Sequence, residues 1–292
     1  MRAKLFVLNL IFILVLNLFL SMPACAIKIG LLNDVQENYV AVSSPGMIID
    51  GFTNSRIVDL QQMQKYYLKK TGDGMQLHIN NRQFNLNTKY VIIKSGQDGF
   101  VSTKNRWYRG DLIVINTGHG LTFINNVPLE YYLMGVVPSE MPSKWNMEAH
   151  KAQAIAARSY AIANLGKRSS HGYDLKDTPE DQAYGGATSE TQRTNYAVAT
   201  TRGQVLVYNE KIIPAYYHAS SGGFTVNSGS VWNKNLPFVR SVPSFDGNLP
   251  KNGHGVGMSQ NGANVLANAG YNAYQILGYF YKDVALRTVN SN

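Results

Sequence analysis

The sequence predicts an α+β fold, in which a β-rich N-terminal region precedes a mixed domain of helices and short strands. Short runs of β-forming residues separated by Gly, Asn and Asp fill the first part of the chain, a pattern typical of antiparallel sheets. Alanine-rich and amphipathic segments with helical periodicity follow. A chain of 292 residues can accommodate the three parts that we expect: a leader at 1–26, the β-rich region at 27–124 and the mixed domain at 125–292.

The first 26 residues have the pattern of a secretory signal peptide. Two basic residues precede an apolar run from Leu5 to Leu20, and residues 24–26 form an Ala-x-Ala ending. The run has about 16 apolar positions, fewer than the roughly 20 that span a bilayer, so an uncleaved anchor is the weaker alternative. We expect cleavage after Ala26 and an exported protein, in the periplasm or cell wall, which would touch the membrane only through an uncleaved leader.

Six runs predict strands in the β-rich region, and Gly-rich segments at 71–74 and 95–99 separate some of them. The predicted strands are Ile27–Leu31, Tyr39–Val42, Met47–Ile49, Met75–Ile79, Tyr90–Lys94 and Leu112–Ile115. No motif in this region carries chemistry, and its two histidines, His78 and His119, are isolated. We expect the boundary to the mixed domain near Asn116–Asn126.

The mixed domain opens with a predicted helix that leads to a carboxylate. Pro128 suits a first turn, apolar residues recur at helical spacing from Leu129 to Val137, and Pro138 is expected to end the helix. Glu140 then lies between Pro138 and Pro142, and each proline fixes its own φ and restricts the residue before it. We expect Glu140 on a stiff loop between two helices.

A second helix is predicted from Asn146 or Met147 to Leu165, with Gly166 as its stop. Its many alanines allow close packing on several sides, as in a central helix. Lys151 and Arg158 are seven residues apart and share one face, about 10 Å apart. They are either solvated cations or site residues.

Two further segments bring polar residues together. Lys211–Ala219 is predicted as a strand that carries Tyr216, Tyr217 and His218 into a Ser-Ser-Gly-Gly loop at 220–223. Residues 253–260 read Gly-His-Gly-Val-Gly-Met-Ser-Gln and lead into a predicted helix at 259–269. A dinucleotide-binding loop is excluded because no βαβ unit surrounds these glycines. A nucleophile elbow is excluded because it requires a glycine two residues after the serine.

Composition excludes several classes of protein. Hydrophobic residues make up 45% of the chain and charged residues 15%, which argues against a disordered chain and a coiled coil. The net charge is +9, but the basic residues form no stripe and no nucleic-acid signature is present, so we expect an anionic extracellular polymer as partner and no nucleic acid. Cys25 is the only cysteine and falls in the predicted leader, so the exported protein would have no disulfide and no thiolate metal site.

Six ordered segments resemble the SpoIID/LytB (stage II sporulation protein D) family, whose members degrade bacterial cell-wall glycan. They are "VPLEYYLMGVVPSEMPSKW" (127–145), "EAHKAQAIAARSYA" (148–161), "QAYGG" (182–186), "TRGQVLVYN" (201–209), "AYYHASSGG" (215–223) with "VW" (231–232), and "GHGVGMSQNGA" (253–263). The resemblance implies a SpoIID-like catalytic domain at 125–292. It also implies a lytic transglycosylase that cuts the bond between N-acetylmuramic acid (MurNAc) and N-acetylglucosamine (GlcNAc) in glycan without stem peptides, leaving a 1,6-anhydro sugar.

The lytic reaction can be catalysed by a single carboxyl group. An ordinary glycosidase needs two, whereas a lytic enzyme can use the same group to protonate the leaving oxygen and then to deprotonate the sugar's own 6-hydroxyl. By resemblance, Glu140 is the catalytic acid, and we expect burial to raise its pKa. Lys151 and Arg158 are implicated in activity by resemblance, and we hypothesise that one of them contacts the lactyl carboxylate of stripped glycan, for which an Arg fork is suited.

The resemblance also implies further groove residues. These are His218, Ser220, Ser221, His254 and Gln260. For Tyr184, Tyr216 and Tyr217, stacking on sugar faces and packing in the core remain equal alternatives.

Two departures from the family concern metal and length. Some relatives bind zinc through Cys and His, but residues 177–181 here read Asp-Thr-Pro-Glu-Asp, so we predict no metal and no cofactor. Only Ser244–Asn252 separates the Ser-Val-Pro segment from Gly253, where the family usually has a longer segment. This leaves open a non-catalytic, glycan-binding enhancer of a cell-wall amidase. A metallohydrolase is disfavoured because the histidines lack ligand spacing.

Overall fold

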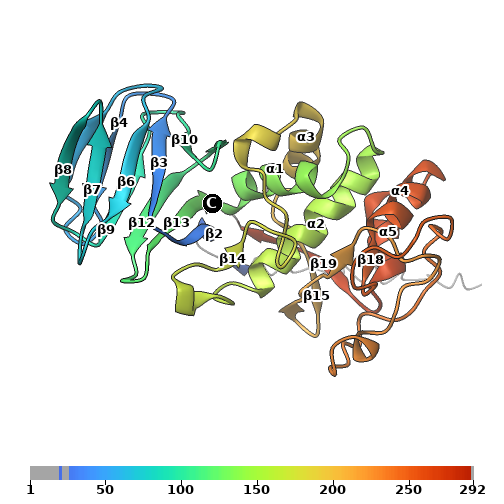
Figure 1. Cartoon of the computed structure of the whole chain (residues 1–292). Coiled ribbons are helices and arrows are strands. Elements are labelled where there is room, and N and C mark those ends of the chain that lie inside the picture. Colours follow the sequence, from blue (N-terminus) through green and yellow to red (C-terminus); the bar gives the residue numbers. More distant parts are fainter. Residues whose placement is uncertain (1–19, 22–25, 291–292) are drawn as a thin grey trace, which may run out of the picture.

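The computed structural model describes residues 20–21 and 26–290. Residues 1–19, 22–25 and 291–292, and with them most of the predicted leader, lie outside the described part. Figure 1 shows a β-rich part formed by the first strands beside a helical part formed by the second half of the chain. This arrangement confirms the predicted α+β class.

Two antiparallel-rich sheets pack face to face in the β-rich part. One sheet has the strand order β11-β10-β3-β6-β7-β8 and the other β14-β2-β13-β12-β9-β4-β5. Their bounds are β2 Ala26–Val35, β3 Glu37–Val42, β4 Gly46–Asp50, β5 Arg56–Leu60, β6 Tyr66–Lys70, β7 Met75–Ile79, β8 Arg82–Leu86, β9 Tyr90–Lys94, β10 Val101–Thr103, β11 Arg106–Tyr108, β12 Asp111–Asn116, β13 Leu121–Pro128 and β14 Leu175–Lys176.

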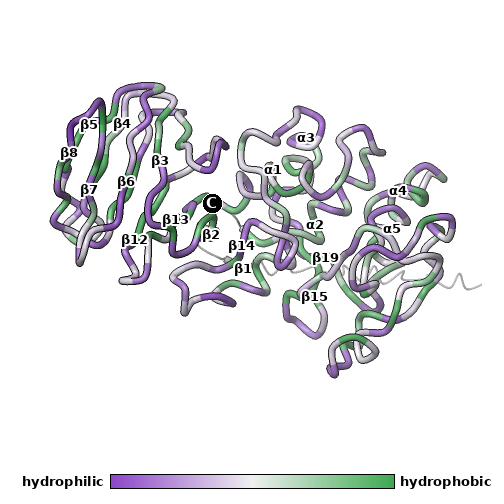
Figure 2. The backbone as a smooth tube through the Cα atoms, viewed as in Figure 1, coloured by the Kyte–Doolittle hydropathy of each residue, from purple (hydrophilic) through white to green (hydrophobic). Residues whose placement is uncertain are grey.

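The side chains between the two sheets form one apolar core. In β6, Tyr66 and Leu68 are buried while Tyr67 is exposed, as the two-residue period of a strand requires. Leu68 belongs to the same core cluster as Ile93 and Val114 of the other sheet. Figure 2 shows the resulting alternation of apolar and polar residues along these strands.

The six predicted strands are confirmed as β2, β3, β4, β7, β9 and β12, and the structure adds six more in this region. β13 pairs with both β2 and β12 and runs directly into the first helix at Leu129. The short strand β14 comes from the second half of the chain and pairs in parallel with β2. The β-rich part and the helical part therefore share one sheet.

Helix α2 (Met147–Ala163) is the centre of the helical part (Figure 1). Its alanine-rich surface contacts α1 (Leu129–Glu140), α3 (Gln192–Thr200), α4 (Gln260–Asn268) and α5 (Ala273–Phe280). The side chain of Asn146 caps α2 by accepting a hydrogen bond from Glu148 N. The predicted central helix is confirmed, although it ends at Ala163 rather than Leu165.

The remaining elements are short. They are the 3₁₀ turns η1 Ser169–His171, η2 Gly186–Ser189 and η3 Ser228–Ser230, the sheet of β1 Leu20–Ser21, β19 Ala285–Asn290, β15 Gln204–Tyr208 and β16 Lys211–Ile212, and the pair β17 Tyr217–His218 with β18 Met258–Ser259. Among the described residues, no helix combines the length and apolar character needed to cross a membrane.

Two local predictions were wrong. Pro138 does not end α1, so Glu140 is the last residue of the helix and does not lie on the stiff loop that was predicted. Proline's φ is compatible with a helix, and the backbone hydrogen bond it removes lies in the last turn. The predicted strand at 211–219 is two separate strands, β16 and β17, which pair with different partners, β15 and β18. The helix predicted at 259–269 is confirmed as α4, with Ser259 as its N-cap.

Candidate active site

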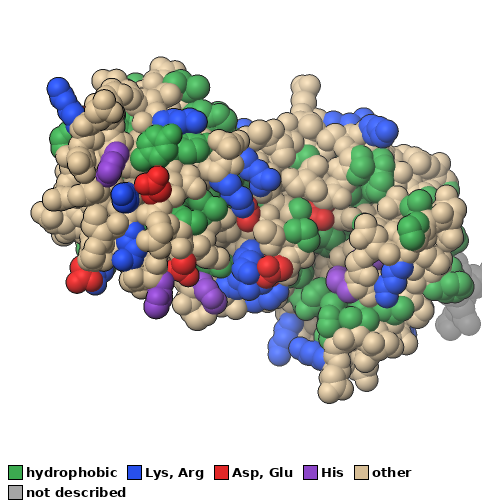
Figure 3. Space-filling model, viewed as in Figure 1, with side chains coloured by type: hydrophobic (Ala, Val, Ile, Leu, Met, Phe, Trp, Pro, Cys, Tyr) green, Lys and Arg blue, Asp and Glu red, His purple; other side chains and the backbone are tan. Residues whose placement is uncertain are grey.

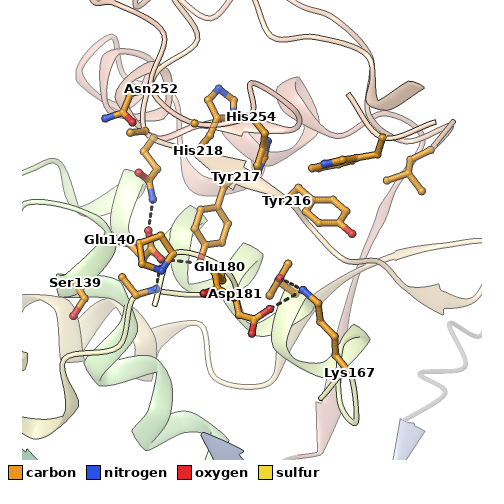
Figure 4. Close-up of a pocket in the computed structure, with 18 of the residues that line it drawn as sticks. Ser139, Glu140, Lys167, Glu180, Asp181, Tyr216, Tyr217, His218, Asn252 and His254 are labelled. Carbon is orange, nitrogen blue, oxygen red and sulfur yellow. Dashed lines mark hydrogen bonds and ion pairs between the residues drawn. The ribbon is translucent and has the colours of Figure 1, made fainter. Parts of the chain in front are cut away.

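Glu140 is the last residue of α1, and its side chain points into a cavity of about 630 Å³. Figure 4 shows the cavity between the end of α1, the 180–183 loop, strand β17 and the loop that carries Asn252 and His254. Four of the predicted site residues line it together with Glu140: Tyr216, His218, His254 and Gln260.

Three hydrogen-bond donors hold the Glu140 carboxyl group. The Ala183 backbone N–H donates to Oε1 at 2.7 Å, the Tyr217 hydroxyl to the same oxygen at 3.4 Å, and Gln260 Nε2 to Oε2 at 3.1 Å. Burial raises the pKa of Glu140 above its ordinary value, although all three donors act in the opposite direction. The group is therefore suited to hold a proton at a higher pH than a solvated glutamate.

A buried amide fixes the direction of the Tyr217 hydrogen bond. Gln182 Nε2 faces the carbonyl of Ala157 at 3.3 Å, which can only accept, so the same nitrogen also donates to the Tyr217 hydroxyl at 2.8 Å. Tyr132 donates to the other end of the amide, Gln182 Oε1, at 3.2 Å. Because the Tyr217 oxygen accepts from Gln182, its own proton is directed to Glu140.

The other carboxylates at the cavity are neutralised by cations. Asp181 accepts from Lys167 at 2.6 Å and from Arg168 at 2.5 Å, and Glu180 pairs with Lys176 at 2.7 Å. Burial alone would raise the pKa of Asp181, but the hydrogen bonds from Arg168 and Lys167 bring it below its ordinary value. Among the described residues that line the cavity, Glu140 is thus the carboxyl group without an ion pair.

Aromatic rings form one wall of the cavity. Trp232 lies between Tyr216, at 4.5 Å between ring centroids, and His254, at 4.9 Å. Burial lowers the pKa of His218 and of His254 to about 4, so both rings are neutral at pH 7. Trp232 was not predicted as a site residue, although it stands in the Val-Trp segment, and Gln182 was likewise quoted only as part of a motif. Tyr217 was considered for stacking on a sugar or packing in the core, and its hydrogen bond to Glu140 was not predicted.

Ser220 and Ser221 lie behind this wall, since both are buried and neither lines the cavity. The Ser220 hydroxyl donates to the carbonyl of Pro250 at 2.6 Å. His218 Nδ1 faces the carbonyl of Val256 at 3.2 Å and must carry the ring proton, so Nε2 accepts from the Ser221 hydroxyl at 2.6 Å. The two serines therefore support the wall.

Asp246 ties the short 244–252 segment to this wall. Its carboxylate is buried and accepts from Ser221 N at 2.8 Å, Gly223 N at 3.0 Å, and the hydroxyls of Ser244 and Ser259 at 2.5 Å each. Burial opposes ionisation, but these donors together lower the pKa of Asp246. One ionised side chain thus connects the 220–223 loop, the short segment and the start of α4.

The structure corrects the expected role of Arg158. Its side chain is fully buried, and all five N–H donors of the guanidinium have acceptors, so none remains for a substrate. Two donors form a fork to Glu130 at 2.7 and 2.8 Å, and the others reach backbone carbonyls of Ala154, Val198 and Gln204. Arg158 anchors the start of α1, at whose other end Glu140 lies.

Lys151 and Tyr184 are also placed away from the main cavity. Lys151 pairs with Glu148 at 2.7 Å on the same helix. Tyr184 is buried, packs on Tyr132 at 4.8 Å and donates to Asn125 at 2.8 Å. Of the alternatives considered for Tyr184, the structure favours core packing.

No metal centre is evident in the described part of the chain. No three His, Cys, Asp or Glu side chains there are grouped so that they could hold a metal ion. The predicted absence of metal and cofactor stays a prediction. Proton transfer at Glu140 is the chemistry that the described side chains themselves can supply.

Comparisons with known proteins bear on the same part of the chain. Residues 117–208 match the family model "SpoIID: Stage II sporulation protein". A protein named "Amidase enhancer" from Bacillus subtilis (strain 168) is 45% identical over 107 residues, covering 37% of this chain and 14% of that protein. "Stage II sporulation protein D" of the same organism is 36% identical over 144 residues, covering 44% and 42%.

An uncharacterized protein of Brachyspira hyodysenteriae is 34% identical over 155 residues, covering 53% of this chain and 42% of that protein. The chain thus spans less than half the length of these curated relatives.

Proposed function

From the match of residues 117–208 to the SpoIID family model, we propose that the chain is a peptidoglycan lytic transglycosylase of the SpoIID/LytB family that cleaves MurNAc–GlcNAc bonds in stem-peptide-free glycan. The observation that carries the proposal is the environment of Glu140. It is a half-buried carboxyl group with a raised pKa, no ion-pair partner among the described residues, and a position opposite an aromatic wall. Such walls suit the apolar faces of sugars.

The reaction uses Glu140 twice. The protonated carboxyl group first gives its proton to the glycosidic oxygen while the bond from that oxygen to C1 of MurNAc breaks. The 6-hydroxyl of the same MurNAc then forms a bond to C1, and its proton passes to the Glu140 carboxylate. A 1,6-anhydro end and a free GlcNAc hydroxyl result, no water is consumed, and Glu140 is again protonated.

The hydrogen bonds at Glu140 fit both halves of this cycle. Burial favours the protonated form that starts it, and the three donors stabilise the carboxylate formed midway. Hydrolysis by the usual two-carboxylate route would need a second free carboxylate. Asp181 and Glu180 are occupied by Lys and Arg, which favours the one-carboxylate route.

The proposal also covers the location of the protein and its binding partners. We place the protein outside the cytoplasm, in the periplasm or cell wall, because its leader pattern and its substrate both belong there. The relative named "Amidase enhancer" supports a cell-wall amidase as a further partner. The substrate itself is the glycan strand.

The test compares wild type with Glu140→Gln on stem-peptide-free glycan, with products identified by mass spectrometry. We expect 1,6-anhydro ends from wild type and none from Glu140→Gln. Glu180→Gln is the matched control, because it removes an ion-paired carboxylate from the same cavity and should retain activity. If wild type binds glycan without cleaving it and stimulates an amidase, the lytic activity is refuted and a non-catalytic amidase enhancer is supported.

A further inference from the structure

A second cavity adjoins the active site. It has a volume of about 570 Å³, and Ser139, Pro179 and Ala183 line both cavities. Ser139 precedes Glu140, and Ala183 donates the hydrogen bond to Glu140. The two cavities therefore form one groove, with the proposed acid at the point where they meet.

The far wall of the second cavity comes from the β-rich part. Strands β10 and β11 are joined by a two-residue turn, Lys104–Asn105, in which both φ angles are positive (54° and 56°). This geometry matches the right-handed twist of the strands and produces a tight hairpin. Lys104 and Arg106 project from it into the lining of the cavity.

The hairpin is held rigidly against the helical part. Trp107 N donates to Thr188 Oγ1 at 2.8 Å, and Arg106 Nη1 donates to the carbonyl of Tyr184 at 3.1 Å. Gly186, with φ of +65°, lies so close that a Cβ atom would be 2.4 Å from the carbonyl of Trp107. Because these contacts involve backbone on both sides, the hairpin is positioned before any ligand arrives.

The second cavity carries an excess of positive charge. Lys104 pairs with the buried Asp177 at 2.7 Å, whereas Arg106 is 3.7 Å from the same carboxylate, so two cations face one anion. In the main cavity the lining charges apart from Glu140 balance: Lys167, Lys234, Glu180 and Asp181. Figure 3 shows Lys and Arg side chains gathered where the β-rich part meets the helical part.

Arg106 retains capacity for a ligand. Its side chain is 41% exposed, and apart from the bond from Nη1 to the Tyr184 carbonyl and a contact with the Tyr108 hydroxyl, its five N–H donors have no hydrogen-bond acceptor in the described part of the chain. Thr188 lines the same cavity, and because its oxygen already accepts from Trp107 N, its own proton is available to a ligand. A guanidinium fork beside a hydroxyl donor suits a carboxylate.

We infer that this second cavity is a carboxylate subsite in which Arg106 and Thr188 bind the lactyl carboxylate of a muramic acid residue beside the bond that is cut. The inference rests on the proposed function for the identity of the ligand. A stem peptide converts this carboxylate to an amide, which removes its charge and adds bulk. The subsite thus makes the β-rich part a determinant of preference for stripped glycan, in the role that Lys151 or Arg158 was expected to fill.

The test measures binding in the Glu140→Gln background, so that no substrate is consumed. Two ligands are compared: stem-peptide-free glycan, and the same glycan with its lactyl carboxylates converted to methylamides. We expect the free carboxylate to bind at least about tenfold tighter, which corresponds to about 1.4 kcal/mol, the low end of the contribution of a hydrogen bond to a charged group. Arg106→Gln should abolish most of this preference and Arg106→Lys part of it.

The control is Arg82→Gln, which removes one cation from the exposed edge strand β8, at the opposite end of the sheet that carries the hairpin, and should leave the preference intact. If Arg106→Gln does not fold, Thr188→Val takes its place and should also reduce the preference. An unchanged preference in the folded variant overturns the subsite. If wild type forms anhydro products but does not prefer the free carboxylate over the methylamide, the subsite alone is refuted. If the preference depends on Arg106 but no glycan is cleaved, the lytic activity alone is refuted.

Discussion

Replacing Arg158 by methionine tests whether this residue stabilises the fold or binds substrate. The change removes the fork to Glu130 and leaves a buried carboxylate whose remaining partner in the described structure is Gly203 N at 3.3 Å. Breaking a buried ion pair in this way costs about 3–5 kcal/mol. Because domains are stable by about 5–15 kcal/mol, the variant should lose about a fifth or more of its free energy of unfolding.

Urea unfolding followed by tryptophan fluorescence measures this loss. The double variant Glu130→Met/Arg158→Met should be more stable than Arg158→Met, since it no longer buries an unpaired charge. The idea is refuted if Arg158→Met unfolds within about 1 kcal/mol of wild type but loses its affinity for glycan with free lactyl carboxylates. That result would indicate that Arg158 binds the substrate.

Three further predictions concern the site and its support. Gln260→Met removes a donor that lowers the pKa of Glu140, so the alkaline limb of the kcat/KM profile should move to higher pH; an unmoved or acid-shifted limb would contradict the role of Glu140 as the acid. Trp232→Ala should raise the Kd for glycan about tenfold or more, as for an aromatic anchor, with a thermal unfolding temperature close to that of wild type as control. Asp246→Asn should lose about 1.5–3 kcal/mol of stability at pH 7. Since the folded-state pKa of Asp246 is lowered, the difference in stability from wild type should shrink as the pH falls through that pKa. A pH-independent difference would count against an ionised Asp246.

Local patterns were enough to predict much of the framework. Runs of β-forming residues predicted six of the strands, and the alanine-rich segment predicted the central helix, starting at Asn146 or Met147. The helix α4 was also predicted from its local sequence, whereas the caps Asn146 and Ser259 were identified from the structure. Glu140 was predicted as the acid from its motif and from the chemistry of a single carboxylate.

Long-range pairing explains what the sequence could not show. Arg158 has its partner 28 residues earlier, so nothing in its own helix indicates that it is buried. Arg106 lies in a region without any motif, and only the packing of its hairpin on Thr188, 81 residues after Trp107, brings it to the groove. Pro138 was expected to end a helix because a proline inside a helix usually does so. The local sequence does not show that this helix extends only two residues further.

We propose that the 6-hydroxyl of MurNAc closes the 1,6-anhydro ring, with Glu140 as acid and then base, and that no water takes part. The most direct measurement is digestion of stem-peptide-free glycan in ¹⁸O-labelled water, with the new muramic ends analysed by mass spectrometry. We expect 1,6-anhydro ends without ¹⁸O from wild type, and no new ends from Glu140→Gln. Reducing ends that carry ¹⁸O, or equal cleavage by Glu140→Gln, would contradict the proposal.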